Sequence, residues 1–422
     1  MRSWRPAIDG RNRRNRIRWL GAALLLSGCA VLPAGAVAQD FQAHGFADLR
    51  LESAAAETSW THGGLGKTRY GDSDGPRIGG AALSAIWQAR PDLLVAADLR
   101  YQPQYHSTVA VIEAFARYRP VSTSAWRWSL KAGEFFPPIS LENDATGWTS
   151  PWTLSSSAIN TWIGEELRTL GAEFRLEHRG EANTFEAGAA LFAANDPVGE
   201  ILFARGWSLG DLVAGIGTRL REPDAYADLI GIAPPRRYDP FTEIDHRLGF
   251  YGDVTWRSAE FGRATLLYYD NRADPSAFQP FNHGDELYAW RTHFTSLGAQ
   301  TGVGNLVLIG QALAGTTEIA PTGFRGEAHF SAAYVLAGWN LGVWRPALRL
   351  DVFTTREDPA ALPALSEHGN AITLALNWRP LEWLRLTGEA LRVDSTRDQR
   401  LALGIAPHQV DRQFQLNVRV LF

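Results

Sequence analysis

Acidic residues gather in one short part of the chain, and they are the first candidates for chemistry. They are Glu134, Glu142, Asp144, Glu165 and Glu166. Arginines recur at positions that alternate with apolar residues: Arg100, Arg117, Arg175, Arg349, Arg379 and Arg385. Carboxylates that face guanidinium groups across a water-filled opening create a transverse field that orients dipolar solutes, whereas rings of one sign select ions. The same charges can instead form ion pairs that brace a protein wall.

Catalytic sets of residues are the second candidates. The chain contains no Gly-x-Ser-x-Gly elbow and no His-Glu-x-x-His pair. Glu165 and Glu166 could act as acid and base, but adjacent residues on a strand point to opposite faces. His44, His293 and His329 fall in predicted strands, where we expect polar groups on the water-filled side. The sequence therefore predicts no catalytic residue, metal site or cofactor.

The C-terminus shows which elements position these charges. Apolar residues occupy alternate positions, with polar residues between them and Leu421 as the exception. The apolar set is Phe414, Leu416, Val418, Val420 and Phe422, and the polar set is Gln413, Gln415, Asn417 and Arg419. This period of two is that of a strand with one apolar and one polar face. A last strand that ends on phenylalanine resembles the assembly signal of outer-membrane barrels.

The same alternation recurs along the chain. It covers residues 43–52, 112–118, 172–177, 184–191, 247–257, 348–352, 372–379 and 384–390. The polar partners are full charges of both signs in strand after strand. A β-sandwich would turn them to solvent, whereas a membrane barrel turns them to a wet lumen and its apolar face to lipid.

Turn lengths and aromatic residues separate these two folds. Short connections are predicted at 89–92, 120–124, 179–183, 258–261, 301–304, 340–342 and 380–381, and long polar loops at 54–75, 135–162, 195–243, 271–285, 356–370 and 394–409. Aromatic residues flank most of the short turns, as in an interfacial girdle. Ordinary packing at sheet corners is the alternative. The prediction is an all-β, antiparallel transmembrane barrel of about 16 strands, or 18 if 195–243 contains two more.

The first 38 residues differ from the rest of the chain. An arginine-rich start, an apolar stretch from Trp19 to Leu26 and the small-residue end Ala36-Val37-Ala38 predict a signal peptide cleaved before Gln39. Residues 39–422 then form the barrel. Cys29, in Leu-Ser-Gly-Cys, is an alternative mature N-terminus that would carry a lipid. Arg13-Arg14 resembles a twin-arginine signal, but that route carries folded cargo, which a barrel cannot be before it meets the membrane.

Removing the predicted signal changes the charge. The full chain has 41 basic and 45 acidic residues; the signal holds seven arginines and one aspartate, so 34 and 44 remain and the net charge is −10. Such a chain offers nothing basic enough to follow a phosphate backbone, so nucleic acid is not expected as a partner. The single cysteine lies in the signal, which excludes a disulfide framework.

The segment Gly133-Glu134-Phe135-Phe136-Pro137-Pro138-Ile139-Ser140-Leu141-Glu142 resembles the loop root of the phosphate-selective porin family. The likeness covers about ten residues, and the rest of the mature chain is similar to porins only in architecture. It implies that residues 135–162 fold inward as a constriction loop between the fifth and sixth strands, and that the protein is a homotrimer. The phosphate pathways of that family rely on lysines, whereas this chain has only Lys67 and Lys131. The resemblance therefore implies the loop and leaves the solute open.

These observations predict a porin-like channel of the outer membrane that passes small hydrophilic solutes or ions by diffusion, without catalysis or cofactor. The expected partners are outer-membrane lipid and the barrel-assembly machinery, through the strand ending at Phe422. Two alternatives are an outer-membrane enzyme of the lipid-hydrolase type and a surface-binding or structural barrel. Aromatic residues of the long loops could bind sugars in the second, although packing of the loops over the barrel mouth explains them as well; they are Tyr70, Trp148, Trp152, Trp207 and Phe241.

Overall fold

The computed structural model describes residues 41–422, apart from residue 72 and residues 225–232, 282–283, 324 and 358–364. The predicted signal peptide, its cleavage before Gln39 and the alternative lipid site at Cys29 lie outside the described residues. Within the described part, no helix is long and apolar enough to cross a membrane.

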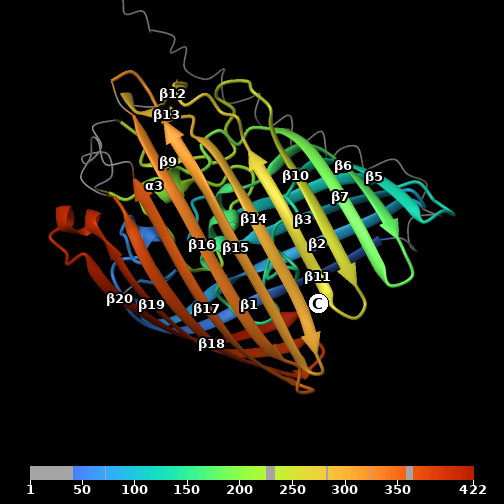
Figure 1. The fold of residues 1–422 in the computed structure, drawn as a ribbon. Coiled ribbons are helices and arrows are strands. Elements are labelled where there is room, and N and C mark those ends of the chain that lie inside the picture. Colours follow the sequence, from blue (N-terminus) through green and yellow to red (C-terminus); the bar gives the residue numbers. More distant parts are fainter. Residues whose placement is uncertain (1–40, 72, 225–232, 282–283, 324, 358–364) are drawn as a thin grey trace, which may run out of the picture. The chain divides into compact units, whose positions relative to one another are not determined.

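Sixteen antiparallel strands close into a barrel, as predicted (Figure 1). They are β1 (Phe41–Ala55), β2 (Gly75–Arg90), β3 (Leu93–Tyr101), β4 (Val109–Tyr118), β5 (Trp126–Phe135), β6 (Thr169–Arg179), β7 (Asn183–Ala193), β10 (Gly249–Ser258), β11 (Gly262–Asp270), β14 (Arg291–Val303), β15 (Leu306–Ile319), β16 (Gly326–Trp339), β17 (Trp344–Glu357), β18 (Glu367–Leu381), β19 (Leu384–Arg397) and β20 (His408–Leu421). β20 pairs with β1, and Gly45 and Phe422 exchange backbone hydrogen bonds of 2.7 and 3.1 Å. Closure leaves no unpaired sheet edge in the wall, which a membrane requires.

The stretch 195–243 does contain two further strands, but they are not part of the wall. β8 (Leu220–Arg221) and β9 (Arg237–Tyr238) pair only with each other, as do β12 (Phe278–Pro280) and β13 (Glu286–Tyr288). The helical elements are also in the loops: α2 (Ala158–Glu166), α3 (Glu200–Ala204), η1 (Trp60–His62) and η3 (Asp398–Leu403). The barrel therefore has 16 strands and not 18.

The period of two in the sequence translates directly into two faces. On β20, Leu416 and Val418 are more than 40% exposed on the outer face, whereas Gln415 and Asn417 are only 2% exposed. The same phase holds on β6, β7, β10 and β19. Burying polar groups inside and exposing apolar ones outside is the reverse of a soluble protein, and it suits a hydrocarbon solvent.

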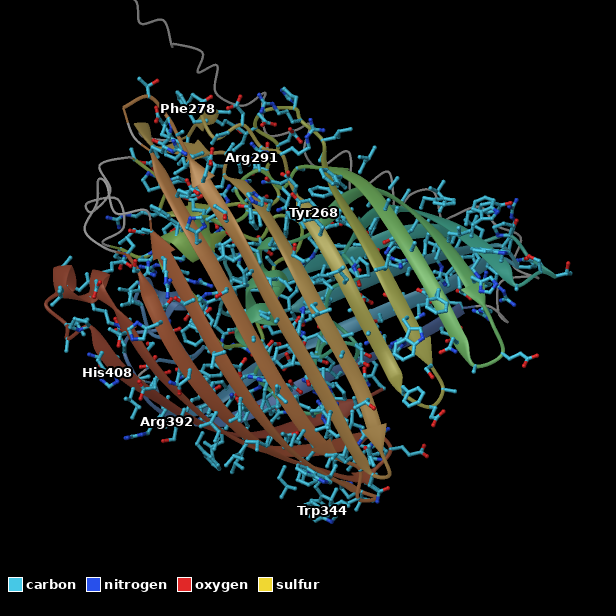
Figure 2. The ribbon with its side chains drawn as sticks, in the orientation of Figure 1. Tyr268, Phe278, Arg291, Trp344, Arg392 and His408 are labelled. Carbon is cyan, nitrogen blue, oxygen red and sulfur yellow. The ribbon has the colours of Figure 1, made fainter. Side chains whose placement is uncertain are left out.

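All seven predicted short turns join neighbouring strands of the barrel, and the long loops lie at the opposite end. The aromatic residues beside the short turns point outward; Trp126, Phe261 and Trp383 are each more than half exposed. Trp344 lies at this end, opposite Phe278 and Arg291 (Figure 2). The predicted girdle is therefore present at the short-turn rim.

Two of the three strand histidines were predicted on the wrong face. His293 follows Thr292 and precedes Phe294, which are buried inside the barrel, so its own side chain points outward. His329 is likewise on the outer face, with its side chain 62% exposed. Both lie near the long-loop end of their strands, beyond the apolar part of the wall. There the outer face becomes polar, while the inner face includes apolar residues such as Phe294 and Phe330 that pack on the inward loop, so polarity no longer indicates the lumen side.

Candidate functional site

The segment between β5 and β6 folds into the barrel and crosses to the far wall. The Leu154 N–H donates to Glu389 on β19 at 2.5 Å, and the Ala158 N–H donates to Asp351 on β17 at 3.2 Å. These acceptors are more than 190 residues away along the chain. The structure thus has the inward loop between the fifth and sixth strands that the resemblance implied.

The inward loop contains a helix where the sequence suggested extended chain. Ser157 caps α2 by accepting the Asn160 N–H at 3.2 Å, and Ser157 donates its own N–H to Glu142 at 3.1 Å. Glu165 and Glu166 therefore lie on a helix, and the strand on which we placed them was wrong. Trp162 on the same helix packs edge-on against Phe294 and Phe330 of the wall, with ring centroids 5.4 and 5.2 Å apart.

Glu165 and Glu166 are both buried and fully engaged. Glu165 pairs with Arg205 and accepts hydrogen bonds from Trp60 and Tyr105 at 3.2 and 3.1 Å. Glu166 accepts hydrogen bonds from the Trp162 and Tyr238 side chains, both at 2.6 Å, and from two backbone N–H groups. Neither carboxylate lines the large cavity described below.

Glu142 and Arg349 form the main brace of the inward loop. Their side chains are completely buried and form an ion pair, while Arg349 also bonds Asp351 at 2.9 Å and the Ser155 carbonyl at 2.6 Å. Arg349 thus ties the loop to β17. Such a charge is tolerated inside because every direction of its guanidinium finds an acceptor.

A second loop segment, residues 195–217, also fills the barrel, which the sequence analysis did not predict. Asp211 lies at its inner end and pairs with Arg50 of β1 and with Arg69, both at 2.6 Å. Arg100 donates to the Asp211 carbonyl at 3.0 Å and to the Gly147 carbonyl, so it joins both inward segments. Burial would raise the pKa of Asp211, but the Arg50 and Arg69 guanidiniums hold it well below its usual range.

The loop between β1 and β2 supplies a third inward segment. Lys67 is 1% exposed, pairs with Glu367 of β18 and donates to the Arg205 carbonyl at 2.9 Å. Burial lowers the pKa of Lys67 to about 8, although Glu367 opposes the shift. Gly206 packs against the same carboxylate with a positive φ of 72°, and a Cβ there would collide with Glu367. These three segments close-pack the long-loop half of the barrel.

The short-turn half instead holds a cavity of about 670 Å³, bounded above by Pro138, Ser140 and Leu141 of the inward loop. Eight basic side chains line it: Arg117, Arg119, Arg127, Lys131, Arg175, Arg179, Arg257 and Arg263. Three acidic side chains line it: Glu173, Glu177 and Glu186. The cavity wall therefore carries five more positive than negative groups, in a chain that is negative overall.

The remaining predicted residues are spread over the lumen. Arg379 and Arg385 line a second cavity of about 480 Å³ beside β18 and β19, together with Arg345. Glu134 is 5% exposed on β5, and neither of its oxygens accepts a hydrogen bond within the described part of the chain. Asp144 is exposed on the inward loop; partial burial raises its pKa, and the nearby Arg263 opposes the shift. The structure thus brings Arg117 and Arg175 together at the large cavity and places Glu142 and Arg349 in the brace.

The aromatic residues of the long loops are packing residues. Tyr70, Trp152 and Trp207 are each less than 7% exposed, and Trp148 stacks on Phe136 with ring centroids 3.6 Å apart. The sequence did contain a sign that the segment 195–217 would fill the barrel, and we did not use it. Residues 198–215 contain many apolar side chains for a surface loop, and that composition itself indicates burial.

Among the described residues, one group of carboxylates has metal-like spacing. Oxygens of Asp196, Glu243 and Asp245 lie within 4.8 Å of one another where the loop 194–248 leaves and rejoins the wall. Each already accepts backbone N–H groups, such as Ile244 N–H to Asp196 at 2.5 Å and Ala194 N–H to Glu243 at 2.8 Å. We assign these carboxylates to holding the two ends of the loop together.

Solved structures share this architecture at very low sequence identity. The outer membrane channel DcaP of Acinetobacter baumannii aligns with a TM-score of 0.56 and 11% identity, over 91% of this chain and 97% of that one. OmpF of Salmonella typhi, in complex with daunomycin, aligns with a TM-score of 0.50 and 12% identity, over 90% of this chain and 97% of that one. No family model matches the sequence, and no curated protein matches it either.

The chain folds as a Gram-negative outer-membrane porin-like barrel. Four features agree with that assignment: the number of strands, the closure of the barrel, the inward loop after the fifth strand and the apolar outer face. At such identities the likeness establishes the fold alone, and the activity has to be argued from the lumen of this porin-like barrel.

Proposed function

We propose that this porin-like barrel is a passive channel for small hydrophilic solutes, with a preference for anions. The observation that carries the proposal is the cavity in the short-turn half, where eight basic side chains meet three acidic ones. Excess positive charge in a confined, water-filled space concentrates anions and repels cations. The local sign of the lumen therefore overrides the negative net charge of the chain.

The three inward segments set the size limit in this proposal. The segments 136–168, 195–217 and 59–71 fill the long-loop half, so the passage that we propose is narrowest there. Their ion pairs to β1, β17 and β18 hold them in fixed positions. Small solutes are therefore favoured, and no residue of the cavity is assigned a catalytic role.

We further propose that the barrel assembles as a homotrimer through its shorter wall. The barrel strands β3 to β7, β10 and β11 have 9 to 11 residues, whereas β14 to β20 have 13 to 15. A short wall is less suited to spanning the bilayer unaided and would gain from contact with a neighbouring copy. Light scattering of the detergent-solubilised protein tests this; a monodisperse monomer would contradict it.

Conductance across a planar bilayer tests the channel proposal. We expect discrete steps of ion current, and in a tenfold KCl gradient a reversal potential shifted towards that of chloride. A protein that folds but gives no current would contradict the channel, and a shift towards the potassium potential would contradict the anion preference alone.

A further inference from the structure

The outer surface of the wall formed by the longer strands, β14 to β20, has a groove that a barrel does not need in order to span a membrane. A shallow groove of about 490 Å³ runs over β14 to β17. Its floor consists of small side chains, Ala312, Ala314, Ser331 and Ala333, and larger side chains flank it, among them Leu297 and Val352. Elsewhere in the same wall the outer face mixes large residues, such as Val335 and Leu350, exposed by 58% and 50%, with small ones such as Ala299 and Ala337.

A row of basic and polar side chains lies directly beyond the groove. His293, Thr316, His329 and Arg356 are successive cross-strand neighbours on the outer face. Each is two residues from a groove residue on its own strand, and therefore on the same face and one step nearer the long-loop end. Thr316 and His329 are in hydrogen-bond contact at 3.1 Å.

Arg356 gives this row a positive charge that forms no ion pair with another described residue. Within the described part of the chain it has no acidic partner, and it is exposed. Two acids, Glu318 and Glu327, stand opposite each other one step nearer the long-loop end, and Glu327 also contacts His329 of the row. Glu327 lies 3.4 Å from Arg325 and 3.6 Å from His329, and Glu318 stands opposite Arg291 in the strand register.

The height of the row places it among lipid headgroups. Twelve residues separate Trp344, in the aromatic girdle, from Arg356 on the same strand. At about 3.4 Å per residue and a tilt of about 40°, this is roughly 30 Å along the membrane normal, slightly more than the apolar band of about 25 Å. The groove then lies at the depth of the acyl chains, and the guanidinium lies at the depth of the phosphates.

We propose that this face binds an acylated glycolipid phosphate of the outer leaflet, with the chemistry of lipid A. One acyl chain lies in the groove over the small side chains, where it buries apolar area that those side chains leave uncovered. The phosphate binds Arg356, whose planar guanidinium matches two phosphate oxygens, and the His293 and His329 rings provide further donors. The site is independent of the channel and does not require that solutes pass.

Native mass spectrometry of the folded barrel in detergent, with added bisphosphorylated lipid A, tests the proposal. We expect the wild-type barrel to retain lipid A at least fivefold better than its dephosphorylated form. Arg356→Glu should abolish that preference, and Ala333→Phe, which fills the groove, should reduce retention of both forms. Arg392→Glu is the matched control, because Arg392 is also an exposed arginine of the outer wall but lies on β19, away from the groove.

Three results would overturn the proposal. Equal retention of lipid A and its dephosphorylated form would show that the phosphate is not recognised. An equal loss of the preference in Arg392→Glu would show that any positive charge on the outer wall attracts the lipid. If Ala333→Phe instead dissociates an oligomer and leaves lipid retention unchanged, the groove holds a second copy of the chain. Heat-modified migration on gels identifies variants that fail to fold, and Ala333→Leu then replaces Ala333→Phe as the milder way to fill the groove.

Discussion

The two halves of the lumen use the same residue types in opposite ways. In the long-loop half, Arg50, Arg69 and Arg349 are each paired with at least one carboxylate and are nearly inaccessible to water. In the short-turn half, Arg175, Arg179 and Arg257 also pair with carboxylates, but Arg117 and Arg127 line the open cavity and form no ion pair with another described residue. Paired arginines hold loops in place, and unpaired arginines create a field. A count of charges in the sequence cannot tell these roles apart, because the difference lies in the neighbours.

The contrast also explains the sign of the cavity. Three acidic side chains of the inward segments form ion pairs in the packed half: Glu142 with Arg349, Glu165 with Arg205, and Asp211 with Arg50. The cavity of the short-turn half keeps five more basic than acidic side chains in its lining. The porin-like barrel thus has a negative net charge overall and a positively charged cavity lining.

The largest expected effect comes from breaking the brace of the second inward segment. Asp211→Ala leaves Arg50 and Arg69 buried without their shared carboxylate, which typically costs about 3–5 kcal/mol. We expect that loss in the free energy of local opening of residues 195–217, measured by hydrogen exchange, together with a larger and noisier channel current.

Asp224→Ala provides the control for that experiment, because Asp224 is 56% exposed and pairs with Arg221 at the surface. Surface pairs contribute at most about 1 kcal/mol. If both variants open the segment equally, the buried pair is not what holds the long-loop half closed.

The next effect is a pH dependence confined to the packed half. Burial raises the pKa of Glu222 to about 8, although Arg205 opposes the shift. Because the folded pKa exceeds that of the released loop, the protonated carboxyl stabilises packing fully below about pH 4.5, and this stabilisation is lost as the pH rises through about 8. Between these values, opening of residues 195–243 should increase by up to about tenfold per pH unit.

Hydrogen exchange at pH 5 to 8, corrected for the intrinsic exchange rate, measures this opening. Glu222→Gln cannot ionise and should make the opening nearly independent of pH in that range. A wild-type loop whose opening does not change with pH would show that Glu222 stays ionised where it lies.

A smaller but diagnostic effect is expected in the open half. Arg117→Glu combined with Arg127→Glu changes the lining from eight basic and three acidic groups to six and five. The excess of positive charge falls from five to one, so the ratio of chloride to potassium permeability should fall several-fold while the barrel stays folded. Reversal potentials measure the ratio, and Arg392→Glu on the outer wall should leave it unchanged.

The smallest expected effect concerns the boundary between the halves. Asp144 is exposed on the inward loop and lies near Arg263 of the cavity wall. Asp144→Asn should raise anion preference by less than about twofold, because one exposed charge is strongly screened at 0.1 M salt. A rise larger than about twofold would show that Asp144 lies in the narrowest part of the passage, and a loss of anion preference would contradict the electrostatic account.

Much of the wall was determined by the sequence alone. Alternation assigned outward and inward faces on β6, β7, β10, β19 and β20, and the seven short turns were all located correctly. These features are local, since a period of two and a tight turn depend only on residues next to one another. The inward face was assigned wrongly for His293 and His329, because the outer face becomes polar there while inner residues such as Phe294 and Phe330 are apolar.

Only the tertiary structure decided which segments fill the lumen of the barrel. The partners of Asp211 and Glu142 lie 161 and 207 residues away, on strands β1 and β17 of the wall. No spacing or pattern in the sequence encodes such a pairing, because it depends on which stretch of wall faces the loop across the lumen. The sequence therefore determined that the lumen is charged, and the fold decided which charges are neutralised and which remain free to act on a solute.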